Sequence, residues 1–359
     1  MLDGIKIVEI EGLGPAPFAG MMLADLGAEV TVIHRKGKAG SITAEASLLD
    51  RGKRSIALDL KDPGDVQVAR ALIARSDGLI EGFRPGVMER LGLGPKECYT
   101  DNPKLTYGRM TGWGQTGPRA MQAGHDLNYI ATSGALYYAG LPEDAPVTPA
   151  TLLGDIGGGA LYLVAGMLAG IIKAGRTGQG SVVDAAIVDG SAHMMNLLMA
   201  LGQGGGLSEN RGESLLDGPH WSRTYRCACG GYVSVQALEP QFYKALLEAL
   251  NLTLDDTMQA QHDARQWDAQ TAKLAAIFLE KSRAEWADHF DGSEACVAAV
   301  LSPHQAAKEP HMNAREVWND AQGALQASAA PRFNGQVAPI KPAPARDADR
   351  AAILAELAL

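Results

Sequence analysis

The sequence predicts an α/β fold of the doubly wound kind, with a large domain built on a parallel sheet and a smaller α+β domain. The first observation is a strand, helix and strand pattern within the first 33 residues. The second is that strand-like and helix-like segments keep alternating, as they do in parallel sheets with helices on both faces. The third is a change of composition near residue 202, which marks a domain boundary.

The first pattern predicts a strand at 5–10, a loop at 11–17 and a helix at 18–26. Gly27 would be the C-cap of this helix, and a second strand follows at 29–33. Its loop begins like a dinucleotide-binding fingerprint, but Pro17 replaces the last glycine of that motif. The basic run 34–38 (HRKGK) stands where an acidic residue would bind a ribose hydroxyl. Cations there suit a phosphorylated ribose, and a solvated basic turn is the alternative.

Further along, the pattern predicts strands at 78–83, 104–110 and 181–184. It predicts helices at 65–76 and 185–201. The apolar run 156–172 raises the question of a membrane span, but it is short for one. It also follows Asp155 and has three glycines at its start. We therefore expect a buried helix and no membrane span.

The glycine-rich stretch 202–210 predicts a flexible linker between domains. We predict that residues 1–200 form the first part of a large domain and residues 201–218 a linker. Residues 219–303 should form a small domain, and residues 304–359 should return to the large domain. In the small domain we expect a hairpin of two strands, at 224–227 and 232–237. Three helices should follow, at 240–250, 264–281 and 283–290, and then a last strand at 296–301. A final helix is expected from Asp347.

The composition is that of a folded globular protein, because 46% of the 359 residues are hydrophobic and only 20% are charged. The formal net charge of -9 gives no attraction for nucleic acid or anionic membranes, so local basic groups must hold an anionic ligand. The four cysteines have neither disulfide-framework nor zinc-ligand spacing, and we expect Cys227 and Cys229 to share one face of a strand as a free packed pair. The first residues show no signal-peptide pattern, so we expect a cytoplasmic protein.

Two residues stand out as catalytic candidates, His125 in 124–129 (GHDLNY) and Asp155 in 153–159 (LGDIGGG). An imidazole and a carboxylate on opposite sides of one carbon could remove a proton from one face and return it to the other, which is the chemistry of epimerisation. Asp126 is poorly placed to orient the imidazole, because neighbours on a helix diverge by about 100°. Glu239, at a predicted strand-to-helix junction, is a distant carboxylate for that task.

Asp155 is expected to open a glycine-rich helix, whose first N–H groups would stabilise an enolate oxygen. The helix dipole favours the ionised carboxylate, whereas burial raises its pKa, and the sequence leaves the balance open. A neutral His125 with an anionic Asp155, or the reverse protonation pair, would be the two resting states, one for each substrate enantiomer.

Six stretches, taken in order and spacing, resemble the α-methylacyl-CoA racemases of the family III CoA-transferase superfamily, and the resemblance runs almost end to end. They are 81–87 (EGFRPGV), 109–118 (RMTGWGQTGP), 124–129 (GHDLNY), 154–159 (GDIGGG), 182–186 (VVDAA) and 239–243 (EPQFY). The resemblance implies a homodimer of interlocked rings, in which the Rossmann-like large domain of one subunit meets the small domain of the other at the active site. It also implies racemisation of 2-methylacyl-CoA thioesters by 1,1-proton transfer through an enolate.

The resemblance also implies roles for individual residues. His125 and Asp155 match the two bases, and Glu239 matches the acid that supports the histidine across the subunit interface. CoA is part of the substrate rather than a separate cofactor, and the residues that would hold it are Arg35, Leu58, Asp59, Leu60, Lys61, Arg90, Gly124, His125, Asp126, Leu127, Asn128 and Tyr129. Thr151 departs from the family, which carries an asparagine four residues before the aspartate, and this difference could alter substrate preference.

Three other functions stay open. A CoA-transferase of the same fold would use Asp155 as a nucleophile and form an acyl-enzyme anhydride, without any need for His125. A non-catalytic acyl-CoA-binding protein would keep the fold and show no turnover. A nicotinamide-dependent dehydrogenase rests only on the first strand, helix and strand pattern, which lacks the third glycine.

Overall fold

The computed structural model describes residues 1–37, 47–320 and 323–359, and the chain divides into two compact units. Unit 1 consists of Met1–Ala135, Pro149–Met194 and Glu309–Leu359. Unit 2 consists of Leu136–Thr148 and Met195–Lys308. The division thus differs from the predicted domains, because a segment inside the predicted large domain belongs to unit 2.

Hydrogen bonds within unit 2 explain this difference. The guanidinium of Arg211 donates to the backbone carbonyls of Ala139, Leu141 and Asp144, at 3.0, 2.7 and 3.0 Å. These bonds attach the segment Leu136–Thr148 to the predicted linker 201–218. The linker is therefore part of a packed unit, although its glycines suggest a flexible connection.

Unit 1 is built on a six-stranded sheet of order β3-β2-β1-β4-β5-β6, in which all neighbours pair in parallel. Its strands are β1 (Lys6–Ile10), β2 (Glu29–Arg35), β3 (Arg54–Leu58), β4 (Gly78–Glu81), β5 (Thr106–Thr111) and β6 (Ser181–Ala186). The order reverses between β1 and β4, which is the switch point of a doubly wound fold. The predicted α/β fold with a parallel sheet is confirmed.

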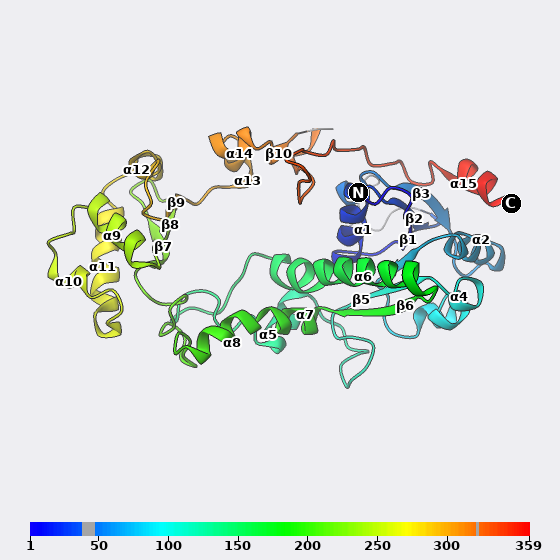
Figure 1. Ribbon diagram of the computed structural model, residues 1–359, viewed down its shortest axis with the longest axis horizontal. Coiled ribbons are helices and arrows are strands. Elements are labelled where there is room, and N and C mark those ends of the chain that lie inside the picture. The colour runs from blue at the N-terminus through cyan, green and yellow to red at the C-terminus, as the bar shows by residue number, and fades with distance from the viewer. Residues whose placement is uncertain (38–46, 321–322) are drawn as a thin grey trace. The chain divides into compact units, whose positions relative to one another are not determined.

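β3 is a strand that the sequence pattern did not predict. It lies at one edge of the sheet, where unpaired backbone groups need partners. The carboxylates of Asp347 and Asp349 accept two N–H groups of this strand, at 2.7 and 2.8 Å. Figure 1 shows the last helix, α15 (Arg350–Leu357), beside β3 and α2 (Pro63–Ala74). The end of the chain thus completes the sheet edge.

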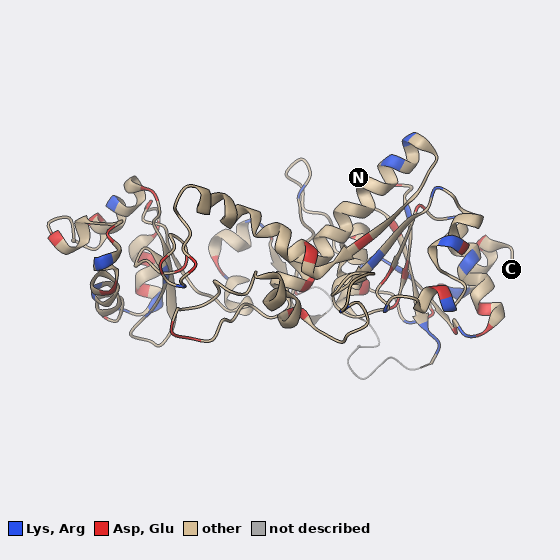
Figure 2. Cartoon of the chain, turned by 90° about the horizontal axis from the view of Figure 1, so that it is seen from below, with Lys and Arg blue, Asp and Glu red and all other residues tan. Residues whose placement is uncertain are grey.

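Helices cover both faces of this sheet and bury two apolar clusters. One cluster includes α1 (Pro15–Asp25) and α6, and the other includes α2 and α15. The remaining elements of unit 1 are α3 (Val87–Arg90), α4 (Pro95–Asp101), α5 (Asp126–Ser133), α7 (Ile187–Met194), α14 (Pro310–Ala314), η1 (Leu48–Asp50), β10 (Trp318–Asn319) and β11 (Gln326–Ala327). α1 begins before the predicted start at residue 18, because a proline suits the first turn of a helix. Figure 2 shows acidic and basic residues interspersed around the sheet.

The apolar stretch around Asp155 forms two consecutive helices, the π-helix η2 (Leu152–Ala160) and α6 (Leu161–Thr177), so the predicted start at residue 156 is wrong. By length and composition this stretch could cross a membrane. Within unit 1, however, α6 packs against β5 and β6, and a Cβ added to Gly170 would lie 2.5 Å from the Thr106 side chain. This close packing on the sheet accounts for the small and apolar residues on one face of the helix.

Unit 2 contains an antiparallel sheet of order β7-β8-β9, at Ser222–Arg226, Tyr232–Gln236 and Val297–Ala299, beside an aromatic core. Its helices are α8 (Asn196–Gln203), α9 (Pro240–Ala249), α10 (Asp256–Gln259), η3 (Ala264–Gln266), α11 (Trp267–Phe278), α12 (Arg283–Phe290) and α13 (Pro303–Ala306). The predicted helix 185–201 is wrong, because β6 runs to Ala186 and α7 ends at Met194 before α8 begins. Cys227 is buried and Cys229 is exposed in the turn after β7, so the prediction of a shared face is wrong as well.

Candidate active site

Two pockets open at the carboxyl edge of the parallel sheet. The first, called the sheet-edge pocket here, has a volume of about 470 Å³ and is lined by residues at the ends of β1, β2 and β3 and after β4. Its lining includes Arg35, Leu58, Asp59, Leu60 and Lys61. Ligand sites of doubly wound folds lie at this edge, near the strand-order switch. The structure therefore brings these predicted CoA-binding residues together, while Lys38 of the basic run lies outside the described residues.

An ion pair that the sequence did not reveal closes one side of the sheet-edge pocket. Arg346 donates to both carboxylate oxygens of Glu11, at 2.7 and 2.9 Å, and to the backbone carbonyl of Arg35. His34 Nδ1 lies 3.3 Å from the same carboxylate. Partial burial works against ionisation of Glu11, but hydrogen bonds from His34 and Arg346 hold its pKa far below the usual range. The charge of Arg346 is thus already compensated within the protein.

The second pocket, called the His125 pocket here, has a volume of about 220 Å³ and is lined by residues after β4 and β5 and by the loop before α5. The ring of Tyr129 stands edge-on to Trp113, with 4.9 Å between centroids, and its hydroxyl donates to the Gly124 carbonyl. A Cβ added to Gly112 would lie 1.9 Å from the Tyr129 ring, so only glycine leaves room for it. These contacts fix the wall of the pocket beside the exposed His125.

The stretch 124–129 contributes to this pocket in part. Gly124, His125 and Tyr129 line it, whereas Leu127 is exposed to solvent. Asp126 is buried, and its Oδ1 accepts the backbone N–H groups of Gly154 and Asp155, both at 2.8 Å. The side chain of Asn128 accepts the backbone N–H of His125 at 3.1 Å. Asp126 and Asn128 thus form hydrogen bonds inside the protein.

Asp155 lies within electrostatic reach of His125. Burial raises the pKa of Asp155 to about 6, with a contribution from the charge of Asp126, and His125 works in the opposite direction. Burial therefore outweighs the effects that favour the ionised carboxylate, a comparison that the sequence left open. Asp155 does not open the helix, which begins at Leu152, so this part of the prediction is wrong. Two N–H groups of the first turn, those of Gly154 and Asp155, are already bonded to Asp126. The backbone of Gly14 comes close to the carboxylate, where an added Cβ would lie 3.6 Å from Oδ2.

Three other residues singled out in the sequence lie elsewhere. Glu239 is in unit 2, exposed at the N-cap of α9, which is the predicted strand-to-helix junction. Arg90 ends α3 and is not among the described residues that line either pocket. Thr151 precedes η2 with a φ of 62°, and its carbonyl accepts the N–H of Ile156. A β-branched residue at this φ is strained.

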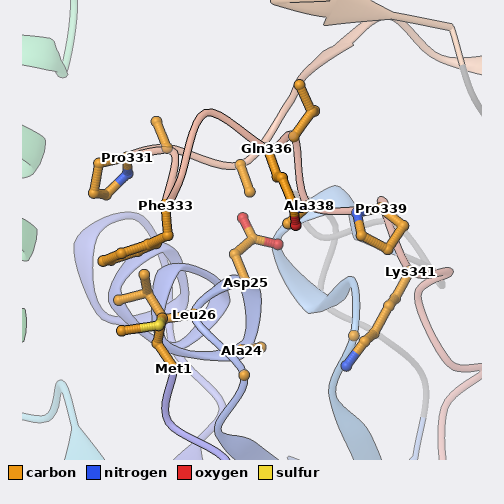
Figure 3. Close-up of a pocket in the computed structure, with 15 residues that line it drawn as sticks. Met1, Ala24, Asp25, Leu26, Pro331, Phe333, Gln336, Ala338, Pro339 and Lys341 are labelled. Carbon is orange, nitrogen blue, oxygen red and sulfur yellow. The ribbon is translucent and has the colours of Figure 1, made fainter.

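A third cavity, of about 330 Å³, lies in unit 1 between the end of α1 and the C-terminal segment around Phe333. Figure 3 shows the Asp25 carboxylate pointing toward Gln336 beside this segment. Asp25 is paired with Arg51, at 2.5 Å. None of the described residues that line this cavity is a predicted site residue, and no cluster of three or more metal-ligating side chains occurs within the described ranges. The predicted site residues that line a pocket therefore line the sheet-edge pocket or the His125 pocket, and Asp155 is not among the described lining residues of either.

The chain is similar to several known proteins. Residues 2–350 match the family model described as CoA-transferase family III. The chain is 42% identical over 317 residues to the alpha-methylacyl-CoA racemase of Mus musculus, covering 88% of this chain and 81% of that protein. It is 29% identical over 345 residues to the acetyl-CoA:oxalate CoA-transferase of Acetobacter aceti, covering 90% and 86%. A solved CAIB/BAIF family protein from Brucella suis matches with a TM-score of 0.82 and 27% identity, over 99% of each chain.

Proposed function

The chain belongs to CoA-transferase family III, and on that premise we propose that it racemises 2-methylacyl-CoA thioesters by moving the α-proton between His125 and Asp155. The family and the relatives support chemistry on CoA thioesters, either racemisation or transfer. The observation that carries the finer proposal is that the residue after His125, Asp126, binds the backbone N–H of Asp155, so that an imidazole and a carboxylate come close together. A transferase that forms an acyl-enzyme anhydride needs the carboxylate alone.

In this mechanism each base serves one face of the α-carbon. One base removes the proton, and the electron pair left on carbon moves onto the thioester carbonyl oxygen to give an enolate. The other base, which starts protonated, delivers its proton to the opposite face as the carbonyl re-forms. Each turnover therefore exchanges the protonation states of His125 and Asp155. A pKa of about 6 lets Asp155 act as donor and as acceptor near neutral pH.

The two pockets suit the two ends of the substrate. The sheet-edge pocket has apolar walls for the base of CoA, including Leu58 and Leu60, and the cations Arg35 and Lys61 for its phosphates. Phe83 lines both pockets. The part of the substrate that links the nucleotide to the thioester can therefore pass Phe83 on its way to His125. We assign the nucleotide to the sheet-edge pocket and the thioester to the His125 pocket.

The proposed active form is a cytoplasmic homodimer without a separate cofactor. The imidazole of His125 is exposed on unit 1, and the carboxylate of Glu239 is exposed on unit 2. An exposed acid at the start of a helix can approach the imidazole of a second copy and hold it in one tautomer. We therefore assign Glu239 as the support of His125 across the dimer.

One incubation separates racemase from transferase. The protein is mixed with one pure enantiomer of 2-methyldecanoyl-CoA, with and without oxalate as an acceptor of CoA, and the acid released by hydrolysis is analysed on a chiral column. A racemase converts the single enantiomer into an equal mixture, whether or not oxalate is present. Formation of oxalyl-CoA with full retention of configuration would instead favour the transferase, and no change of either kind would favour a binding protein.

A further inference from the structure

We infer that Asp126 is a positioning residue that fixes the two proposed bases relative to each other. Its backbone follows directly from His125, while its carboxylate binds the backbone of Asp155. The inference rests on the proposed function, and it assigns Asp126 a role other than the contact with CoA that the family resemblance implies. Three features of the described residues support it: the geometry of the hydrogen bonds, the fit of the glycines around them, and the placement of charge.

Both hydrogen bonds converge on one oxygen of a buried side chain. The N–H groups of Gly154 and Asp155 each lie 2.8 Å from Asp126 Oδ1, and Asp126 is 6% exposed. Its neighbour two positions on, Asn128, binds the N–H of His125. The first turn of α5 therefore holds the backbone of both proposed bases. A displacement of this turn would move the imidazole and the carboxylate together.

The π-helix η2 is packed so closely that the bonded turn has no room to shift. A Cβ added to Gly154 would lie 2.5 Å from Asp126 Oδ1 and 2.8 Å from Ile130 Cγ2. On the side facing α7, a Cβ added to Gly158 would lie 2.3 Å from Ser191 Oγ. The glycines thus let η2 pack against both α5 and α7. Asp126 is the buried charged group at this contact.

The carboxylate of Asp126 also acts on the charge of Asp155. The titratable groups that affect Asp155 are Asp126 and the imidazole of His125, and Tyr129 of the same helix faces it as well. From the loop before α1, the uncharged backbone of Gly14 approaches. A negative charge beside Asp155 favours its protonated form, which is the form that returns a proton to the enolate.

Two substitutions separate the geometric part from the charge. Asp126→Asn keeps an oxygen for both N–H groups and removes the charge, whereas Asp126→Ala removes both. For Asp126→Ala we expect kcat to fall about 100-fold with little change in KM, because a misplaced base is costly and the buried carboxylate is bonded to the protein itself. For Asp126→Asn we expect a smaller loss, and the pH profile of the direction in which Asp155 donates should move to lower pH. Asp291→Asn, an exposed acid in unit 2, is the matched control and should behave as wild type.

A titration without substrate keeps this inference separate from the proposed function. The Asp155 carboxyl is followed by ¹³C NMR in wild type and in Asp126→Asn, and its pKa should be lower in the variant. An unchanged pKa together with an unchanged pH profile would overturn the inference, even if the wild type racemises its substrate. So would an Asp126→Ala variant with a raised KM and a normal kcat, which would return Asp126 to CoA binding. A wild type without α-proton exchange would overturn the proposed function, and the titration would still report on the pair.

Discussion

Arg346 and Glu11 lie 335 positions apart in the chain and form a two-point ion pair at the sheet-edge pocket, with N to O distances of 2.7 and 2.9 Å. Glu11 follows β1, and Arg346 belongs to the last segment of the chain. The guanidinium also binds the backbone carbonyl of Arg35, at the end of β2. The end of the chain therefore fixes a residue whose side chain we assign to the phosphates of CoA.

Replacing Arg346 with alanine should weaken substrate binding more than chemistry. Without the guanidinium, the carbonyl at the end of β2 loses a donor. Glu11 keeps only His34 and the backbone N–H of Arg35 as partners, so its negative charge is less compensated beside the bound phosphates. We expect KM for the acyl-CoA to rise about tenfold while kcat stays within about twofold. Steady-state kinetics measure both quantities, with the exposed Arg315→Ala as control. An unchanged KM would show that the pair does not shape the pocket.

Asp155→Asn should stabilise the protein at neutral pH. The pKa of Asp155 rises from 3.8 to about 6 on folding, so the folded state binds this proton more tightly and ionisation lowers stability. The variant should be more stable by on the order of 1–2 kcal/mol near pH 7, a figure reduced for solvent screening. Urea unfolding at several pH values measures this difference, which should shrink as the pH falls from about 6 towards 3.8. A constant difference would contradict the shifted pKa.

Thr151→Asn should also stabilise the fold. Thr151 has a φ of 62°, and asparagine tolerates this left-handed conformation better than a β-branched side chain. We expect a gain of about 1 kcal/mol in the free energy of unfolding. Thr253→Asn, in an exposed position outside the positive-φ set, is the control and should give no such gain. Equal effects of the two substitutions would argue that the conformation of Thr151 is not strained.

Glu239→Gln should lower kcat and leave the fold intact. The side chain is exposed at the N-cap of α9, so its replacement disturbs no core packing, whereas the amide supports a protonated imidazole less well. We expect kcat to fall at least about tenfold with an unchanged KM. Glu280→Gln, also exposed in unit 2, should keep full activity. A normal kcat in Glu239→Gln would remove Glu239 from the site.

The elements that local patterns define were predictable. The apolar runs of β1, β2, β4, β5 and β6 predicted a parallel sheet. The GHDLNY and LGDIGGG motifs gave His125 and Asp155 as catalytic candidates, which stays a prediction. β3 was missed because it begins with the polar Arg54 and Ser55 and is completed by carboxylates from the end of the chain.

The polar contacts that organise the site depend on tertiary structure and left no local signal. Asp126 binds residues 28 and 29 positions away, and Arg346 binds Glu11 across nearly the whole chain. The helix that carries Asp155 begins as a π-helix after a left-handed Thr151, a conformation that hydrophobic periodicity does not specify. The direction of the pKa shift of Asp155 likewise required its burial to be known.

The central claim is that His125 and Asp155 serve opposite faces of the α-carbon, and uptake of deuterium at that carbon tests it most directly. Each pure enantiomer of 2-methyldecanoyl-CoA is incubated in D₂O with wild type, His125→Gln and Asp155→Asn. Wild type should exchange both enantiomers, and each variant should lose about 100-fold in rate on one enantiomer only, a different one for each variant. If both variants lose exchange on the same enantiomer, or slow both enantiomers equally, the two residues do not act as opposed bases.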